Sequence, residues 1–343
     1  MAIGVAVLGT GRIGGRYIEW TNGVPGAEVR VVAEANPEAA AKWQDQYPDL
    51  DFVSDYKEAL KRDDVDAVVI TLPHWLHRQA AIDAANAGKH IYVEKPMAVW
   101  PSEAREMLAA ARLNGVKVMT AHTQRYQRPV KAMKEIVESK RFGDLIMAYD
   151  MWHKPYEPFG RPKWMLDREL GGGMGQMDGT HEIDRLLHLI GYDVDTVSAR
   201  VGQFTYPREK YQDIKADDTA MCFIRWKSGV VATISRIAWE KGATEYGTDM
   251  FFTEGMARLR IAYGQGPGQK TAIWVGDTPA GTWQEESVDD TSPFEEEIAD
   301  FIAAIERGDE DTPIPQEHGL RVLEVLEATE ESSRTGREIV LDW

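Results

Sequence analysis

The stretch VAVLGTGRIGGRYIEW, residues 5–20, decides the fold, because a run of apolar, β-branched residues leads directly into closely spaced glycines. Gly9, Gly11 and Gly14 have the spacing G-x-G-x-x-G between a predicted strand and a predicted helix. In a dinucleotide-binding fold the first glycine permits the tight turn and the second lets the backbone approach a pyrophosphate. The third lets the helix pack closely on the strand, and the free N–H groups of the helix favour phosphate.

The next predicted strand, in EVRVVAEA at residues 28–35, ends near Glu34, which lies 20 residues beyond Gly14. A carboxylate there accepts hydrogen bonds from ribose hydroxyls and repels the 2′-phosphate of NADP, so the pattern favours NAD. Arg12, beside Ile13 in the same loop, offers a cation for that phosphate. NADP therefore remains an alternative, as does a glycine turn that binds no dinucleotide.

Short apolar runs alternate with segments of helical period from residue 3 to about residue 122. Strands that are each followed by a helix predict βαβ units and a parallel sheet covered on both faces, which is a doubly wound, Rossmann-type α/β fold. Pro101 and Gly115 lie where one crossover helix should begin and end. We expect the strands within residues 3–9, 28–35, 66–73, 90–96 and 116–122.

After about residue 123 the pattern of apolar residues changes. Longer strand-like runs are joined by short turns at Ser228-Gly229 and Glu254-Gly255, which predicts a large, mostly antiparallel open sheet. Apolar residues at i, i+3, i+4 and i+7 in residues 292–309 and 317–336 predict two amphipathic helices. The second half is therefore expected to be an α+β domain.

The composition limits the functions to consider. The 343 residues suit two domains, which we place at residues 1–123 and 124–343. The net charge of -17 repels phosphate backbones and anionic membranes, so we expect neither nucleic acid nor membrane as a partner. The one cysteine, Cys222, excludes an intrachain disulfide, and no apolar stretch approaches the ~18 residues of a membrane span. We expect a cytoplasmic protein.

Six motifs extend over nearly the whole chain. They are VLGTGRIG at 7–14, TLPHWLH at 71–77, AGKHIYVEKPMA at 87–98, GGGMGQMDGTHEID at 171–184, DDTAMCFIRWKSGV at 217–230, and the final helical segment at 294–339. In these motifs and in their order the chain resembles the glucose-fructose oxidoreductase/inositol dehydrogenase/MocA (Gfo/Idh/MocA) family. The resemblance implies an NAD(P)-dependent sugar or polyol dehydrogenase, whose C-terminal domain binds substrate and forms a homodimer or homotetramer through its sheet.

The segment HIYVEKPMAV, residues 90–99, places Lys95 between Glu94 and Pro96 at the end of a predicted strand. The resemblance implies that Lys95 contacts a substrate hydroxyl and the nicotinamide ribose, with Glu94 at the same cofactor edge, and that the bond before Pro96 is often cis. Such strand ends bind ligands in doubly wound sheets, and partial desolvation lowers the pKa of a lysine. A donor there can stabilise alkoxide character while hydride leaves. The alternative is a solvated lysine.

The motif GTHEID supplies His181, with Asp184 three residues later on the same helical face. An imidazole can accept a hydroxyl proton near neutral pH, and the resemblance assigns this role to His181. A structural histidine satisfied by Asp184 is the alternative. Relatives often have aspartate at the position of Met177, whereas Asp178 is rotated by ~100° on a helix. We include Asp178 among the substrate-binding candidates, and the sequence leaves its direction open.

The resemblance also supplies flanking candidates. Of the two histidines in TLPHWLH, spaced three apart, neither has a thiolate or carboxylate nearby to complete a ligand set, so we predict no metal. Aromatic faces can cover the apolar faces of sugar rings, although a core role is the alternative for each tryptophan. The cofactor candidates are Thr71, Pro73, His74, His77 and Gln124, and the substrate candidates are Tyr126, Trp152 and Trp164, the last within a Pro-rich and aromatic segment at 151–170.

Together these features predict transfer of hydride between nicotinamide and a secondary carbinol of a sugar, cyclitol or related polyol. An NAD-retaining glycosidase or lyase that acts by transient oxidation and elimination is an alternative. A non-catalytic dinucleotide sensor is a second alternative. The sequence does not define which sugar is bound or which carbon is oxidised.

Overall fold

The computed structural model describes residues 2–155, 161–205, 214–238, 244–262, 270–277, 281–288 and 292–343. The chain divides into two compact units. The first comprises Met1–Thr123 and Ser292–Leu323, and the second comprises Gln124–Thr291 and Glu324–Trp343. This division differs from the predicted boundary in one segment, because residues 292–323 belong to the first unit although the sequence suggested the second.

The first unit contains a parallel sheet of six strands in the order β3-β2-β1-β4-β5-β6, which confirms the doubly wound fold. Its central strands are apolar runs because they are buried on both faces. The short edge strand β3 escaped the sequence analysis. The strands are β1 (Ile3–Leu8), β2 (Ala27–Ala33), β3 (Asp51–Val53), β4 (Ala67–Ile70), β5 (His90–Glu94) and β6 (Val118–Ala121).

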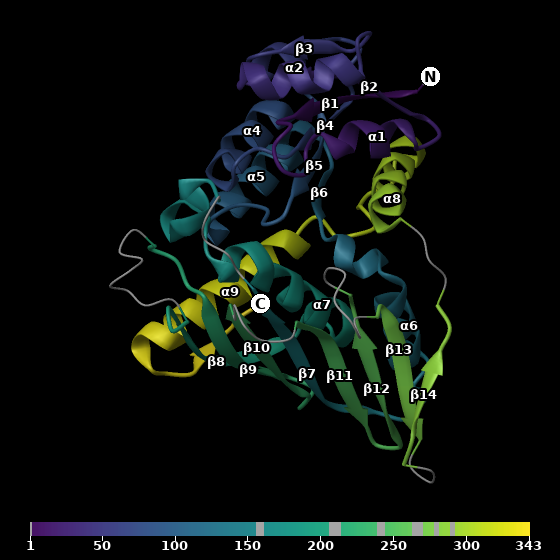
Figure 1. Cartoon of the computed structure of the whole chain (residues 1–343), viewed down its shortest axis with the longest axis vertical. Coiled ribbons are helices and arrows are strands. Elements are labelled where there is room, and N and C mark those ends of the chain that lie inside the picture. Colours follow the sequence, from purple (N-terminus) through teal and green to yellow (C-terminus); the bar gives the residue numbers. More distant parts are fainter. Residues whose placement is uncertain are drawn as a thin grey trace. The chain divides into compact units, whose positions relative to one another are not determined.

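Helices cover both faces of this sheet. Helix α4 packs beside α5 on one face and α1 packs beside α8 on the other (Figure 1). The ring of Trp20 on α1 stacks on Phe294 of α8 with 4.1 Å between ring centroids, and this contact explains why α8 joins the first unit. The helices are α1 (Arg16–Asn22), α2 (Pro37–Gln46), α3 (Tyr56–Leu60), α4 (His74–Asn86), α5 (Pro101–Asn114) and α8 (Pro293–Arg307).

The second unit contains a nine-stranded sheet in the order β14-β13-β12-β11-β7-β10-β9-β8-β15. Among the described strands of this sheet only β7 and β10 pair in parallel, so the predicted mostly antiparallel open sheet is confirmed. The strands are β7 (Leu145–Lys154), β8 (Val194–Gly202), β9 (Thr219–Trp226), β10 (Val231–Ala238), β11 (Glu245–Phe252), β12 (Gly255–Arg260), β13 (Ala272–Asp277), β14 (Trp283–Glu286) and β15 (Ile339–Val340).

Helices α6 (Arg128–Glu138) and α7 (Thr180–Ile190) belong to the second unit, and α9 (His318–Thr335) begins in the first and ends in the second. Side chains along β9 alternate between buried and exposed, as expected for a sheet with one covered face. On its other face Met221 is 60% exposed and Phe223 is 42% exposed. Among the described residues, every helix is too short or too polar to span a bilayer.

Candidate functional site

The glycine loop after β1 has the geometry that its spacing predicts. Gly9 has φ +94°, a backbone conformation that side chains rarely tolerate. A Cβ on Gly14 would lie 2.4 Å from the carbonyl oxygen of Gly9, so the third glycine permits the close approach of the backbone segments. A Cβ on Gly11 would meet no atom within 4 Å, which leaves room for a pyrophosphate against the backbone. Arg12 and Ile13 continue this loop into the turn before α1.

The carboxylate of Glu34, directly after β2, faces the glycine loop. Its Oε2 accepts hydrogen bonds from the backbone N and the hydroxyl of Thr10, both at 2.7 Å, and its Oε1 accepts from the backbone N of Asn36 at 2.8 Å. These three donors fix the carboxylate beside the loop where a ribose would be recognised. Sequence reasoning missed Thr10, although its place between Gly9 and Gly11 was a usable signal.

Side chains after β4 connect the glycine loop to the segment after β5. The Thr71 hydroxyl donates to the carbonyl oxygen of Gly9 at 2.8 Å. Both ring nitrogens of His77 lie near carbonyl oxygens, with Nδ1 2.9 Å from that of Pro96 and Nε2 2.7 Å from that of Leu72. His77 is fully buried, and burial lowers its pKa. His77 thus links the segment after β4 to the segment after β5.

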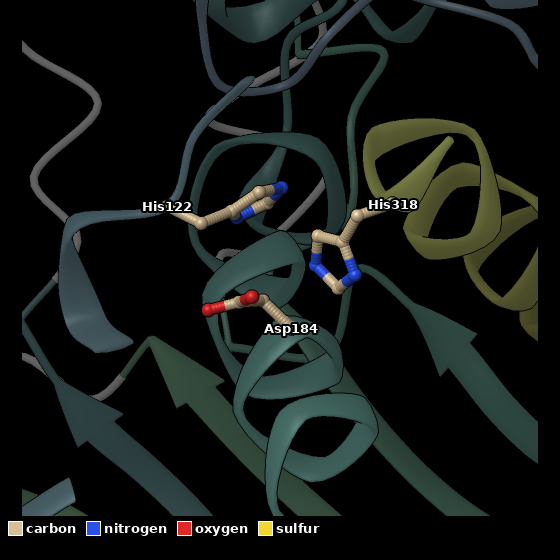
Figure 2. Close-up of side chains that lie close together, drawn as sticks. All are labelled: His122, Asp184 and His318. Carbon is tan, nitrogen blue, oxygen red and sulfur yellow. The ribbon is translucent and has the colours of Figure 1, made fainter. Parts of the chain in front are cut away.

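Pro73 precedes α4, and His74 lies at the start of that helix with its ring edge-on to the ring of His77, 5.5 Å between centroids. His122, which follows β6, makes a similar edge-on contact with His318 at 4.8 Å (Figure 2). Both His122 and His318 are buried within the first unit. The sequence analysis did not single out either of them.

Lys95 follows β5 directly, and the peptide bond to Pro96 is cis, as the resemblance suggested. The Lys95 backbone N donates to Glu94 Oε2 at 3.0 Å, and the Tyr17 hydroxyl donates to Glu94 Oε1 at 2.6 Å. Because β1, β4 and β5 are adjacent and parallel, Lys95 lies on the same sheet edge as the glycine loop and Thr71. That edge, at the switch of strand order between β1 and β4, is where such sheets bind ligands.

In the second unit a π-helical turn, Gly175–Gly179, leads into α7, which carries His181. Such turns are frequent at functional sites. This turn sets the directions of Met177 and Asp178, which the sequence left open. Met177 packs in an apolar cluster with Met174, whereas Asp178 Oδ2 lies 2.9 Å from Lys154 Nζ.

The His181 ring lies against Trp152 of β7, with 5.9 Å between ring centroids. Trp152 is only 3% exposed, stacks on Tyr246 at 4.0 Å, and has the Lys154 ammonium 4.0 Å from its ring centroid. These contacts fix the position of the Trp152 ring beside His181. Sequence reasoning missed Lys154, which ends β7 without a distinctive motif.

The other candidates lie near the start of the second unit or on short helices. Gln124 and Tyr126 lie on the 3-10 helix Thr123–Tyr126, where the Lys131 ammonium is 4.9 Å from the ring centroid of Tyr126, a buried side chain. Asp184, drawn in Figure 2, accepts a hydrogen bond from Arg125 Nε at 2.7 Å. Trp164 lies on the 3-10 helix Lys163–Leu166, half-buried. Residues 156–160 of the predicted substrate segment lie outside the described residues.

Buried ion pairs surround α7. Arg236 Nη1 lies 2.9 Å from Glu182 Oε2, and Arg185 Nη2 lies 2.7 Å from Asp150 Oδ1. Burial raises the pKa of both carboxyl groups, and the neighbouring arginine acts in the opposite direction in each case. A Cβ at Gly179 would collide with the Arg236 guanidinium, so this glycine makes room for the ion pair.

Comparison with known proteins identifies the two halves of the chain. Residues 3–122 match the model described as "Oxidoreductase family, NAD-binding Rossmann fold", and residues 130–258 match the "GFO/IDH/MocA C-terminal domain". A 1,5-anhydro-D-fructose reductase of Ensifer adhaerens is 30% identical over 295 residues, 84% of each chain. An inositol 2-dehydrogenase of Arthrobacter sp. (strain FB24) is 25% identical over 340 residues, 98% of this chain and 95% of the relative.

A solved structure of levoglucosan dehydrogenase in complex with NADH superposes with a TM-score of 0.87 over the full length of both chains at 22% identity, which supports the fold. The family models show the family itself, because they match the sequence in the Rossmann domain and in the sheet domain that follows it. The chain therefore belongs to the Gfo/Idh/MocA family of oxidoreductases, and its first 122 residues contain an NAD-binding Rossmann domain.

Proposed function

We propose that this protein is an NAD-dependent dehydrogenase that oxidises a secondary carbinol of a sugar, cyclitol or related polyol to a ketone. The observation that carries the proposal is the position of Lys95, at the carboxyl end of β5 on the sheet edge that holds the glycine loop and Glu34. The names of two relatives, inositol 2-dehydrogenase and 1,5-anhydro-D-fructose reductase, support a substrate of this class.

The residues around the glycine loop fit NAD. Gly11 leaves space for the pyrophosphate, and Glu34 is fixed by Thr10 with a carboxylate that accepts ribose hydroxyls. Thr71 holds the loop through Gly9, and we assign Pro73, His74, His77 and Gln124 to the surroundings of the same cofactor. When bound there, NAD supplies the acceptor for the substrate hydride.

Lys95 and His181 divide the proton chemistry in this proposal. The Lys95 ammonium donates a hydrogen bond to the reacting oxygen and stabilises the alkoxide character that this oxygen gains as its proton is removed and loses as hydride leaves. His181 takes or relays the hydroxyl proton, a role that imidazoles serve in general acid-base catalysis. Trp152 fixes the His181 ring, and the pair of Asp178 with Lys154 fixes Trp152, so we assign these side chains to the substrate side together with Tyr126 and Trp164.

The test is a panel of sugars, inositols and other polyols with NAD or NADP, followed by the absorbance of reduced nicotinamide. We expect turnover with NAD, a loss of at least about 100-fold in kcat for Lys95→Met and for His181→Ala, and no effect of Lys61→Met, an exposed lysine of the first unit. Turnover of Lys95→Met within a few-fold of the wild-type value would show that the lysine has no such role.

The same panel separates the alternatives. Cofactor retained through purification, with cleavage of aryl glycosides in the absence of added NAD, indicates the redox-neutral reaction. Normal NAD affinity without turnover of any panel member indicates a dinucleotide sensor. Either result replaces the dehydrogenase proposal.

A further inference from the structure

Behind Lys95, the first unit buries a carboxyl group among neutral hydroxyls. Glu297 of α8 is fully buried, and its Oε2 accepts hydrogen bonds from the Tyr92 hydroxyl and the Thr123 hydroxyl, both at 2.8 Å. Its Oε1 has no hydrogen-bond partner within the described residues. Without a cationic donor, burial favours the neutral acid and raises the pKa of Glu297 to about 8.

Glu94 lies in a different environment, although it is linked to Glu297 through the contacting rings of Tyr17 and Tyr92. It accepts hydrogen bonds from the Tyr17 hydroxyl and from the backbone N of Lys95. Burial raises its pKa, while the charge of Lys95 and the hydrogen bond of Tyr17 act to lower it. Of the two carboxyl groups, Glu94 is thus the one that has a cation beside it.

The aromatic rings make these groups one packed cluster. Tyr17 and Tyr92 are fully buried with 5.7 Å between ring centroids, and Tyr92 also contacts Phe301 of α8 at 5.6 Å. The titratable groups that influence one another are Tyr17 from α1, Tyr92, Glu94 and Lys95 from β5 and its end, and Glu297 from α8, and the backbone of His122 adds a neutral hydrogen bond to Glu297. Two carboxyl groups in so small a buried space disfavour simultaneous ionisation.

We propose that Tyr17, Tyr92, Glu94 and Glu297 are positioning residues for Lys95, in which Glu297 keeps a proton so that the cluster's single negative charge stays on Glu94. This charge favours the ammonium form of Lys95, and the hydrogen bond from its backbone fixes the peptide from which the side chain extends. The functional consequence rests on the proposed role of Lys95 in hydride transfer. None of the four residues needs to touch the substrate.

One substitution at two positions tests the proposal. Glutamine is neutral and has nearly the shape of a protonated glutamate, so Glu297→Gln should leave the environment of Lys95 unchanged, whereas Glu94→Gln removes the charge. The readout is the pH dependence of acylation of the Lys95 amine in the intact protein, measured by peptide mass spectrometry. We expect Glu94→Gln to lower the apparent pKa of Lys95 by about one unit and Glu297→Gln to leave it unchanged.

A second matched pair of variants, Tyr17→Phe and Tyr92→Phe, tests the same proposal if the glutamine variants do not fold. Tyr17→Phe removes the donor to Glu94, makes its charge less favourable, and should lower the apparent pKa of Lys95 by less than Glu94→Gln does. Tyr92→Phe removes a donor to Glu297 and should leave the Lys95 titration unchanged. Both variants keep the buried ring, and thermal unfolding checks that they fold.

Equal shifts within either pair, or no shift with Glu94→Gln, would overturn the proposal. The measurement needs neither substrate nor turnover, so its outcome is independent of the dehydrogenase assignment. If Lys95→Met remains active while the acylation results hold, the proposed catalytic role fails and the charge arrangement stands. If the pH dependence of Lys95 acylation is the same in all the variants while Lys95→Met is inactive, the proposed positioning role is wrong and the catalytic role of Lys95 stands.

Discussion

The two units bury carboxyl groups in opposite ways. Around Lys95 in the first unit, Glu297 is held by the hydroxyls of Tyr92 and Thr123. Around α7 in the second unit, Glu182 is held by the guanidinium of Arg236. A buried group with hydroxyl partners becomes neutral by keeping a proton, whereas a buried group with an arginine is neutralised by the pair.

The difference lies in whether a cation opposes the effect of burial on the pKa of the carboxyl group. Glu297 keeps its proton to a higher pH than an ordinary glutamate, because no cation compensates its charge among the groups that it contacts in the described chain. The arginine of an ion pair stays charged throughout the physiological range. Burial raises the pKa of Glu297 and of Glu182, but only at Glu182 does a neighbouring guanidinium, that of Arg236, act in the opposite direction.

Breaking an ion pair in the second unit should have the largest effect. Arg236→Met leaves Glu182 buried without its partner, and we expect a loss of about 3–5 kcal/mol in the free energy of unfolding, measured with urea. The control is Arg225→Met, whose partner is Asp195 and whose side chain is 46% exposed, with an expected loss of at most about 1 kcal/mol. Similar losses for both variants would remove the contrast between the units.

The next largest effect on the free energy of unfolding should come from raising the pH, through the buried Glu297 of the first unit. The pKa of Glu297 is raised by folding, so the folded chain binds one more proton than the unfolded chain between the ordinary glutamate pKa near 4.3 and about 8. This contribution to stability is complete below that range and is lost as the pH rises through it. The wild-type protein should lose about 1.4 kcal/mol per pH unit relative to Glu297→Gln. Parallel stability curves for the two proteins between pH 5.5 and 7.5 would contradict this expectation.

Glu34 is a further case of a carboxyl group with neutral partners. It accepts hydrogen bonds from neutral donors, as Glu297 does, but it is less deeply buried than Glu297. Its carboxylate should recognise the ribose of NAD. Glu34→Ala should weaken NADH binding roughly tenfold or more, as expected for lost hydrogen bonds to a charged acceptor, and should weaken NADPH binding less. Quenching of protein fluorescence measures both affinities, with Glu38→Ala as the exposed control. Equal losses for the two cofactors would exclude this role.

The smallest effect on stability is expected at the outer face of the second unit's sheet. We predict a homodimer or homotetramer through this face, where Met221 and Phe223 are exposed. The double change of both residues to lysine should reduce the mass in light scattering to 38.5 kDa. The unfolding midpoint of the resulting monomer should change little, because neither side chain belongs to the core. A wild-type mass of 38.5 kDa would contradict the predicted assembly.

Much of the first unit could be predicted because its signals are local. The spacing of Gly9, Gly11 and Gly14 follows from backbone demands within one turn, and the alternation of apolar runs follows from burial on both faces of a parallel sheet. The position of Glu34 follows from the length of one βαβ unit. The placement of Lys95 at a strand end needed only the proline after it and the apolar run before it.

The sequence by itself therefore determined the fold class, the family resemblance and a preference for NAD, since each depends on motifs of residues close together in the chain. Only the tertiary structure decided that residues 292–323 join the first unit, that Asp178 turns toward Lys154, and that Tyr92 contacts Glu297 across 205 positions. Such contacts leave no periodic trace, because they depend on how separate elements pack. The protonation of a buried carboxyl group depends on those same distant partners, and so it cannot be read before the chain is folded.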